Sequence, residues 1–520
     1  MVRRGCKPGH VRRRSPRNLR VPLHSARWAE PRRASASEPG GVKRASELAI
    51  VAMKQGNQRQ RDPAERRASR DMEPGEGKMT ETQGSQRIST RLERIAGLSR
   101  QRRGQPLTTL AHHIDLAWLR EAHRRTRRDG AAGVDGQRAA EYAKQLEDNL
   151  QSLLERAKSG SYRAPPVKRV HIPKGSGSET RPIGIPTFED KVLQRAVAMV
   201  LEAVYEQDFL DCSYGFRPGR SAQQALTVLH RDTMKMGGGW VVELDIRKYF
   251  DSIDHQRLRE VLRRRIGDGV ILRLIGKWLN AGVLEDGAVT YSDQGSPQGG
   301  VVSPILANIL LHEVLDVWFA KEVRPRLRGR AHLVRYADDA VMLFETEEDA
   351  RRVMAVLSLR FGRYGLTLHP EKTRLLDFRK PTRVKGRGAP ARATGKPATF
   401  DFLGFTLHWG MSFAGKLAVK TRTAKDRFKR SLSNISNWCK LHRHEPLERQ
   451  QHCLNQKLRG HYGYFGRVGN RDRLWTLLHW VKRAWQRWLH RRSQRGINWS
   501  DMVRILKRYP LLAPTAVHIA

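Results

Sequence analysis

The sequence has few cysteines and, relative to its basic residues, few acidic ones. Four cysteines occur among 520 residues, at positions 6, 212, 439 and 453, and no two form a Cys-x-x-Cys pair. This spacing argues against a disulfide framework and a structural zinc site, and it suits a reducing cytoplasm. There are 98 Lys and Arg against 52 Asp and Glu, a net charge of +46. Such an excess disfavours an ordinary metabolic enzyme and favours nucleic acid as partner, with a basic scaffold protein as the alternative.

The sequence also lacks a membrane-spanning run, a secretory leader and a fixed-period repeat. The basic N-terminus has no apolar segment behind it, as a secretory signal requires. The most apolar long stretch, 300–319, contains Ser303, Asn308, His312, Glu313 and Asp316. A membrane span does not tolerate that set, so we expect a soluble protein without a membrane partner.

Residues 1–78 differ in composition from the rest. They hold 20 Lys and Arg against 8 Asp and Glu among Pro, Ser, Gly and Ala, with almost no aromatic residues. This composition predicts a disordered basic extension, with a nucleic-acid-binding arm or a later translation start at Met72 or Met79 as alternatives. The remaining 442 residues keep 78 basic against 44 acidic side chains, a net charge of +34.

Hydrophobic periodicity predicts a mixed α and β protein beyond this extension. Apolar residues at helical spacing predict helices over 107–128, 138–159 and 189–205, and Ser303 and Pro304 have the order of an N-cap and a first helical residue. The run 240–245 predicts a strand that ends in Asp245, and 333–344 predicts two strands around an acidic turn. A basic loop is predicted over 379–397. After residue 420 the sequence predicts basic helices, one with an apolar stripe of Leu474, Leu478, Val481, Trp485 and Trp488.

Three carboxylates at predicted strand ends are the clearest chemical signal. Asp338 and Asp339 lie in the turn between the two strands of 333–344. Adjacent carboxylates repel, and burial without a cation raises their pKa, whereas a divalent metal relieves both effects. An exposed Asp-Asp turn is the common alternative for such a pair alone. Asp245 adds a third carboxylate, and three can hold two Mg²⁺ about 4 Å apart.

These motifs resemble the metal-binding motifs of reverse transcriptases. Leu-Asp-Ile-Arg-Lys-Tyr-Phe-Asp at 244–251 and Tyr-Ala-Asp-Asp at 336–339 carry the resemblance. Further blocks follow the family's order: 181–186, 214–221, 294–300, 365–373 and 402–405. Together with Gly-Val-Asp-Gly at 133–136, the sequences of these blocks are similar to those of the group II intron-encoded reverse transcriptase/maturase. The resemblance covers about residues 107–510.

The resemblance implies an α+β fold, a right-hand polymerase with fingers and palm of reverse-transcriptase type followed by an α-helical thumb/maturase domain. It implies these boundaries: a basic extension over 1–78, an N-terminal helical extension and fingers over 79–235, a palm with the metal site over 236–420, a helical thumb/maturase region over 421–510, and a tail over 511–520.

The resemblance also implies roles for individual residues. Asp245, Asp338 and Asp339, with the carbonyl of Ile246, are the expected ligands of two Mg²⁺ ions, with Mn²⁺ as a possible substitute. Phe250 is expected to exclude the ribose 2′-hydroxyl, with a core aromatic as the alternative. Lys174 and Arg181 are expected to meet triphosphate oxygens unless they are merely solvated, and Gln298 to line the nucleotide pocket. Lys372 is the candidate acid for the departing pyrophosphate, with a surface lysine as the alternative.

RNA contact is expected from the C-terminal region. The segment 456–466 mixes basic and aromatic residues, which suits phosphate neutralisation and base stacking, although a buried aromatic cluster is the alternative. The candidate RNA-binding residues are Lys457, Arg459, Tyr462, Tyr464 and Arg467.

The expected function is therefore that of an RNA-directed DNA polymerase and maturase. Its expected partners are intron RNA, an RNA template with a DNA primer, dNTPs and target DNA, in a bacterial cytoplasm near the nucleoid. The chain ends about ten residues after 509–512 without paired cysteines, so no endonuclease is expected and the primer would come from elsewhere. The alternatives are a retron or CRISPR-associated reverse transcriptase and a non-catalytic splicing factor. The sequence does not determine the oligomeric state.

Overall fold

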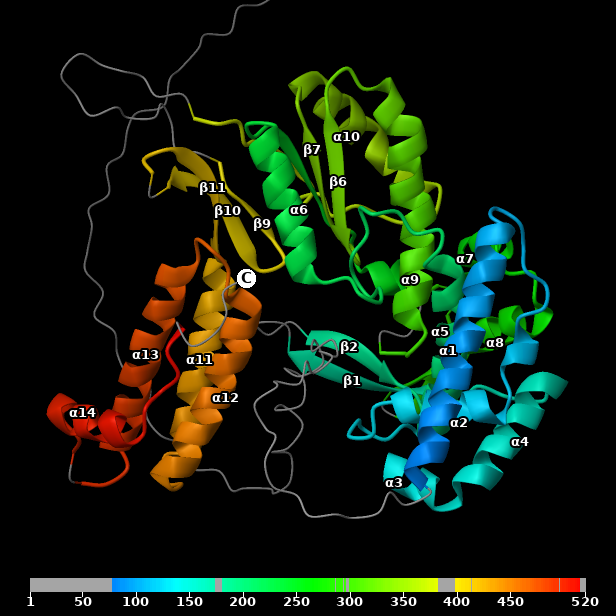
Figure 1. Cartoon of the computed structure of the whole chain (residues 1–520), viewed down its shortest axis with the longest axis horizontal. Helices are drawn as coiled ribbons and strands as arrows, with labels where there is room; N and C mark the ends of the chain where they lie inside the picture. The colour runs from blue at the N-terminus through cyan, green and yellow to red at the C-terminus, as the bar shows by residue number, and fades with distance from the viewer. Residues whose placement is uncertain are drawn as a thin grey trace, which may run out of the picture. The chain divides into compact units, whose positions relative to one another are not determined.

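A computed structural model describes residues 77–173, 180–285, 287–292, 294–295, 299–381, 398–412, 414–494 and 496–514, with side chains from residue 86 onwards. Helices and sheets are mixed over these ranges, which confirms the α+β prediction (Figure 1). The α-helices are α1 (Gly77–Gln101), α2 (Leu116–Arg125), α3 (Ala139–Tyr142), α4 (Leu146–Ser159), α5 (Phe188–Tyr205), α6 (Ala222–Lys235), α7 (His255–Arg263), α8 (Gly269–Leu279), α9 (Ser303–Leu311), α10 (Glu347–Gly362), α11 (Lys425–Leu441), α12 (Leu447–Phe465), α13 (Arg471–His490) and α14 (Trp499–Arg508). The strands are β1 (Val167–Pro173), β2 (Thr180–Ile185), β3 (Trp240–Leu244), β4 (Val283–Glu285), β5 (Ala288–Thr290), β6 (Ala331–Tyr336), β7 (Asp339–Phe344), β8 (Arg374–Asp377), β9 (Phe400–Phe402), β10 (Phe405–Met411) and β11 (Leu417–Thr423). The predicted extension over 1–78 lies outside the described residues except for its last two, and most of the loop over 379–397 also lies outside them.

The N-terminal helices pack around α5, whose predicted range agrees with the structure to within one residue. The long helix predicted over 107–128 is wrong, because the chain turns before α2 begins. Asp268 accepts hydrogen bonds from the backbone of Leu110 and Ala111, and the Asp115 side chain then caps α2 at Trp118 N. The helix predicted over 138–159 is likewise divided into α3, a short 3₁₀ turn and α4.

The central sheet has the strand order β6-β7-β3-β8, with every pair antiparallel. Alternate residues of each strand face opposite sides of the sheet. Val241 and Leu343 pack in one core with α6, whereas Val242 and Met342 pack in another with α10. The two helices therefore cover opposite faces, which leaves the strand ends and the β6–β7 turn at the edge.

The second sheet, β2-β1-β4-β5, includes a parallel pairing between β1 and β4. The backbone at Gly299 lies so close to β2 that a Cβ there would overlap the carbonyl oxygen of Gly184. In addition, Gln194 on α5 accepts a hydrogen bond of 2.7 Å from Val301 N. The start of α9 is thus held against both β2 and α5.

Helix α9 continues through two π-helical stretches, His312–Val317 and Phe319–Val323. Within the described residues, the segment Ser303–Arg326 is the one helix long and apolar enough to cross a membrane, but 72% of its apolar window is buried inside the protein. Packing in the main core therefore accounts for its composition. Ser303 is the first helical residue and not the cap, because Val302 occupies the N-cap position.

The C-terminal part consists of the sheet β11-β10-β9 and the helices α11 to α14 (Figure 1). The predicted stripe on α13 is confirmed, since Leu474, Leu478, Val481 and Trp485 are buried and Trp488 packs at the margin of their core. Buried Asn470 joins sheet and helices: its side chain accepts from Thr423 N at 2.8 Å and donates to the Phe465 carbonyl at 2.8 Å.

Candidate active site

The three predicted carboxylates lie at one edge of the central sheet. Asp245 follows the last residue of β3, and the register pairs Leu244 with Ala340, next to Asp339 on β7. Tyr336 pairs with Asp339, so Ala337 and Asp338 form a two-residue turn. The antiparallel register therefore brings two segments about 90 residues apart in the sequence to the same edge.

The β6–β7 turn has an unusual backbone. Ala337 has a φ of +56°, a left-handed conformation that costs free energy for any residue with a Cβ. The chain at Gly215 packs directly beneath it, because a Cβ at Gly215 would overlap the backbone nitrogen of Ala337. Close packing against the 214–221 block thus holds the turn that carries Asp338.

The block over 365–373 holds the other carboxylate. His369 N donates to the Asp245 carbonyl at 2.8 Å, and Arg247 N donates to the Thr367 carbonyl at 2.9 Å. These two hydrogen bonds lie on either side of Ile246, and the carbonyl of Ile246 takes part in neither of them. Lys372, from the same block, places its Nζ 3.2 Å from Asp245 Oδ2. Its ammonium is the nearest described cation to that carboxylate.

The carboxylates repel one another, and their pKa values show it. Burial removes water from the Asp338 carboxylate and so raises its pKa, and the charge of Asp245 raises that pKa further. The pKa of Asp339 is raised to about 7, first by desolvation and then by the charges of Asp338 and Asp245, although the residue keeps access to solvent. The protein therefore leaves negative charge at this edge incompletely compensated.

The donor set fits a hard divalent cation. Carboxylate and carbonyl oxygens are the ligands that Mg²⁺ and Mn²⁺ prefer, and a bound cation removes the repulsion just described. Within the described ranges, no three His, Cys, Asp or Glu side chains are already gathered closely enough to hold a metal ion. Binding of a metal ion at this edge would therefore require the carboxylate side chains to move closer together.

The predicted nucleotide-binding residues are only partly within the described chain. Arg181 is exposed on β2, and its charge lowers the pKa of both Asp338 and Asp339, so it lies within electrostatic reach of them. Phe250 is half-buried, packed against the main core with its ring 5.5 Å from that of Tyr249. Lys174 and Gln298 lie outside the described residues.

The predicted RNA-binding residues separate into three groups. Lys457 and Arg459 are exposed on α12. Tyr462 is fully buried and donates its hydroxyl to the Leu512 carbonyl, so its ring is not available for base stacking in this structure. Tyr464 and Arg467 bond to the protein itself: Tyr464 donates to the Leu403 carbonyl at 2.9 Å, and Arg467 donates to the Gln223 carbonyl at 3.1 Å. The last two connect the C-terminal helices to the rest of the chain.

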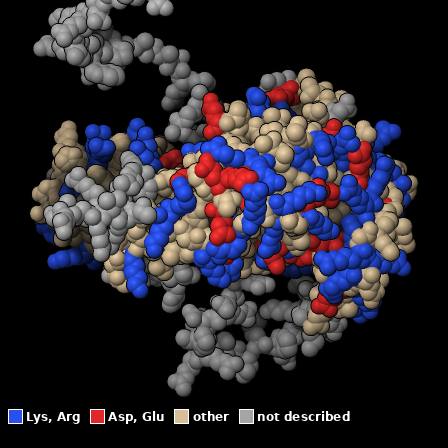
Figure 2. Space-filling model, turned by 90° about the horizontal axis from the view of Figure 1, so that it is seen from above, with Lys and Arg blue, Asp and Glu red and all other residues tan. Residues whose placement is uncertain are grey.

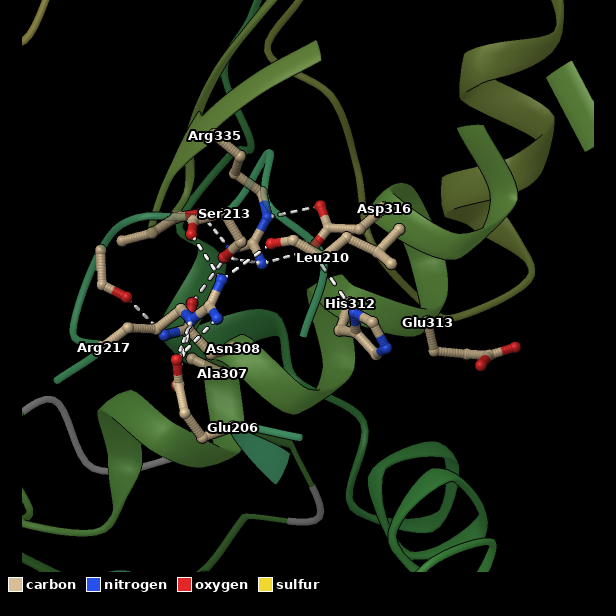
Figure 3. A network of polar contacts seen from close by, with 12 residues as sticks. Glu206, Leu210, Ser213, Arg217, Ala307, Asn308, His312, Glu313, Asp316 and Arg335 are labelled. Atoms are coloured by element: carbon tan, nitrogen blue, oxygen red, sulfur yellow. Dashed lines mark hydrogen bonds and ion pairs between the residues drawn. The ribbon is translucent and has the colours of Figure 1, made fainter. Parts of the chain in front are cut away.

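Sequence reasoning missed a buried polar network behind the carboxylates (Figure 3). Arg335 and Asp316 are both fully buried and form an ion pair at 2.6 Å. The signal that could have revealed them is charge of opposite sign within two apolar segments, 333–336 and 300–319.

Comparisons with known proteins agree with this geometry. The reverse transcriptase (RNA-dependent DNA polymerase) family matches residues 172–407, and the group II intron maturase-specific domain matches residues 428–509. Protein YkfC of Escherichia coli is 41% identical over an alignment of 297 residues that covers 50% of this chain and 76% of that protein.

Two further relatives are named for introns. The group II intron-encoded protein LtrA of Lactococcus lactis is 38% identical over 216 residues, 39% of this chain and 36% of that protein. Nuclear intron maturase 2 of Arabidopsis thaliana is 27% identical over 231 residues, 37% of this chain and 30% of that protein. With both domains matched in order, the chain belongs to the family of group II intron-encoded reverse transcriptase/maturases, RNA-directed DNA polymerases that carry a maturase domain.

Proposed function

We propose that this chain copies intron RNA into DNA at the carboxylate edge of the central sheet. The observation that carries the proposal is the position of Asp245 and the Asp338–Asp339 turn at the same edge of the central sheet, in a chain of this family. In this assignment residues 79–235 are the N-terminal extension and fingers, 236–420 the palm, and 421–510 the thumb and maturase region. The flanking segments 1–78 and 511–520 take no part in the chemistry.

Asp245, Asp338 and Asp339, with the Ile246 carbonyl, would hold two Mg²⁺ ions, with Mn²⁺ as a substitute. When bound, such ions lower the pKa of a primer 3′-hydroxyl and neutralise the charge that develops on pyrophosphate. The incompletely compensated negative charge of the edge and its all-oxygen donors support this assignment.

The remaining residues of the site bind and orient the substrates. Arg181 reaches the triphosphate from β2, and Lys174 and Gln298 complete that pocket. Phe250 lies five residues beyond Asp245 and excludes the ribose 2′-hydroxyl by its bulk. Lys372 donates a proton to the departing pyrophosphate. Its 3.2 Å contact with Asp245 supports a role beside that carboxylate.

The C-terminal region binds the intron RNA. Lys457 and Arg459 on α12 neutralise phosphates, and the exposed part of the Tyr464 ring adds an aromatic surface. Bound in this way, the protein helps the intron to fold for splicing and then copies it during insertion into target DNA (retrohoming), in a bacterial cytoplasm near the nucleoid.

Primer extension tests the polymerase. The purified full chain is given an RNA template with an annealed DNA primer, dNTPs and Mg²⁺, and we expect extended DNA. A chain that binds the RNA tightly but makes no DNA would contradict the proposal and favour a non-catalytic splicing factor.

A splicing assay tests the maturase. The RNA is the intron transcribed from the region around the reading frame, and we expect the protein to accelerate its splicing at low Mg²⁺. The absence of intron RNA domains around that frame would instead favour a retron or CRISPR-associated reverse transcriptase.

A further inference from the structure

Arg335 lies inside the protein directly behind the β6–β7 turn. It is 0% exposed although it belongs to an apolar strand, and its guanidinium points away from the sheet toward Asp316 (Figure 3). Nε and Nη2 donate to the two carboxylate oxygens of Asp316 at 2.7 and 2.6 Å. Asp316 is itself 0% exposed and lies in the π-helical stretch that follows α9.

The other guanidinium hydrogens reach the turn and its support. Nη1 donates at 2.9 Å to the Ala337 carbonyl and at 2.9 Å to Asn308 Oδ1. Nη2 also donates at 2.7 Å to Ser213 Oγ. Asn308 in turn donates at 2.6 Å to the carbonyl of Gly215, whose backbone packs beneath the turn. All five N–H groups of the guanidinium thus have acceptors.

Such an arrangement is costly if stability is its only purpose. A buried ion pair gains little over an apolar pair of similar size, because both charges lose their hydration. The geometry, however, is specific: the Ala337 carbonyl belongs to the peptide that leads into Asp338, and Ala337 holds the left-handed φ of +56°. A hydrogen bond to that carbonyl fixes the plane of this peptide.

We propose that Arg335 is a positioning residue for DNA synthesis, which holds the Ala337–Asp338 peptide in the orientation that directs the turn's carboxylates toward the metal ions. The proposal rests on the assignment of Asp338 and Asp339 as metal ligands. Asp316, Asn308 and Ser213 orient the guanidinium, and Gly215 lets the backbone approach. A displacement of about 1 Å at a reacting centre can reduce a rate about 100-fold, so an error in this peptide is expected to slow the chemical step.

Single-turnover primer extension separates positioning from folding. The rate constant reports the chemistry of correctly folded molecules, whereas the amplitude reports how many such molecules are present. The central variant is Arg335→Met combined with Asp316→Leu, which removes both charges of the buried ion pair. His312, whose Nδ1 lies 3.7 Å from Asp316 Oδ2 in the wild type, loses that contact in the variant. We expect a lower amplitude and Tm than in the wild type, because Asn308, Ser213 and the Ala337 carbonyl lose a donor. Among the molecules that fold, we expect a rate constant about 10- to 100-fold lower and a higher half-saturating Mg²⁺ concentration.

Arg335→Lys is the second variant. Lysine keeps the charge opposite Asp316 but lacks the planar fork that reaches Asn308 and the Ala337 carbonyl together. We expect it to fold and to show a similarly reduced rate constant, with an unchanged Kd for the template–primer. If it extends the primer at the wild-type rate, the role of Arg335 is only to balance the charge of Asp316, and the proposal is wrong.

Arg265→Met is the matched control. Arg265 is also buried, but it lies outside this network: it bonds to Asp208, to Ser99 and to the carbonyls of Arg102 and Gln105. None of its bonds reaches the turn or the 213–221 segment, so we expect a lower amplitude with an unchanged rate constant. A wild-type rate constant in Arg335→Met/Asp316→Leu would overturn the inference, whereas a wild-type protein that makes no DNA would overturn the proposed function instead.

Discussion

At the scale of single residues, the position of the carboxylates depends on backbone contacts as much as on the carboxylates themselves. Gly215 allows the 214–221 block to pack against the β6–β7 turn, and the hydrogen bond from His369 N holds the carbonyl of Asp245. Neither residue carries a group that reacts. Each nevertheless determines where one of the carboxylates lies.

Replacement of Gly215 with alanine tests this close contact. The new Cβ would overlap the backbone nitrogen of Ala337, so the turn must shift. We expect a loss of about 1–3 kcal/mol in the free energy of unfolding and a primer-extension rate about 10- to 100-fold lower. Denaturant titration and single-turnover extension measure the two effects.

Gly460→Ala is the control for that variant. A Cβ at Gly460, on α12, meets no atom within 4 Å. We expect the free energy of unfolding to rise by about 0.5–1 kcal/mol, as alanine favours the helix, with no change in extension. A Gly215→Ala protein as active as Gly460→Ala would show that the contact does not position the turn.

Phe250→Ala tests the proposed selection of deoxyribonucleotides. The ring is half-buried, so truncation opens space beside the nucleotide and also removes packing from the core. We expect the ratio of kcat/KM for rNTP to that for dNTP to rise by about 10-fold or more. Steady-state incorporation of CTP and dCTP opposite the same template base measures it. An unchanged ratio with slower use of both substrates would assign Phe250 to the core alone.

At the scale of elements, α12 has two different faces. Leu454, Leu458 and Tyr462 are buried against α13, whereas Lys457 and Arg459 are exposed, with the Lys457 ammonium 5.3 Å from the centre of the Trp438 ring. Beyond the end of α12, Arg467 bonds to Gln223 and Thr227 on α6. The mixture of basic and aromatic residues in 456–466 therefore serves several purposes, and its exposed cations are the part that we propose to meet phosphates.

The salt dependence of RNA binding tests those cations. In Lys457→Ala/Arg459→Ala, two phosphate contacts are lost, so the slope of log Kd against log salt concentration is expected to fall by about 1.4–1.8. Arg351→Ala/Arg363→Ala, on α10 and at its end, is the control with the same loss of charge. Equal slopes for both double variants would show that net charge, and not this face of α12, governs binding.

Strong periodicity predicted several elements of the fold. The segments now seen as α5, β3, α13 and the β6–β7 hairpin have continuous patterns of apolar residues, so their sequences alone indicated them. The breaks before α2 and between α3 and α4 escaped prediction, because distant or capping groups cause them. Asp268, for example, bonds to the backbone more than 150 residues before it.

The same distinction applies to the candidate site. Asp245, Asp338 and Asp339 were predicted from motifs and strand ends. Arg335 and Asp316 were not, because an ion pair between segments 19 residues apart leaves no periodic signal. Tyr462 was assigned to RNA from local composition, but a helix periodicity that includes Leu454 and Leu458 places it in the core.

At the scale of the whole molecule, the basic charge is widely spread. Lys and Arg cover much of the face shown in Figure 2, with acidic side chains between them. Residues 79–520 keep a net charge of +34, so the excess belongs to the folded part as well as to the N-terminal extension. The three carboxylates at one sheet edge are negative charges in a protein of positive net charge, and they suit a bound cation. The basic surface suits nucleic acid.

The central claim is that this edge synthesises DNA, and a comparison of two aspartates on the central sheet tests it most directly. Asp338→Asn removes one oxygen ligand at the carboxylate edge. Asp377→Asn makes the same change at the other end of β3, where Asp377 pairs with Trp240 and bonds to Arg379. Primer extension on an RNA template is measured for both variants, together with their RNA affinity.

We expect Asp338→Asn to lose extension by about 100-fold or more, with RNA affinity within a few-fold of the wild type, because it removes a metal ligand and not a phosphate contact. Asp377→Asn is expected to extend the primer at a rate within about two-fold of the wild type, since a paired surface carboxylate contributes little. Full DNA synthesis by Asp338→Asn, or an equal loss in both variants, would contradict the account.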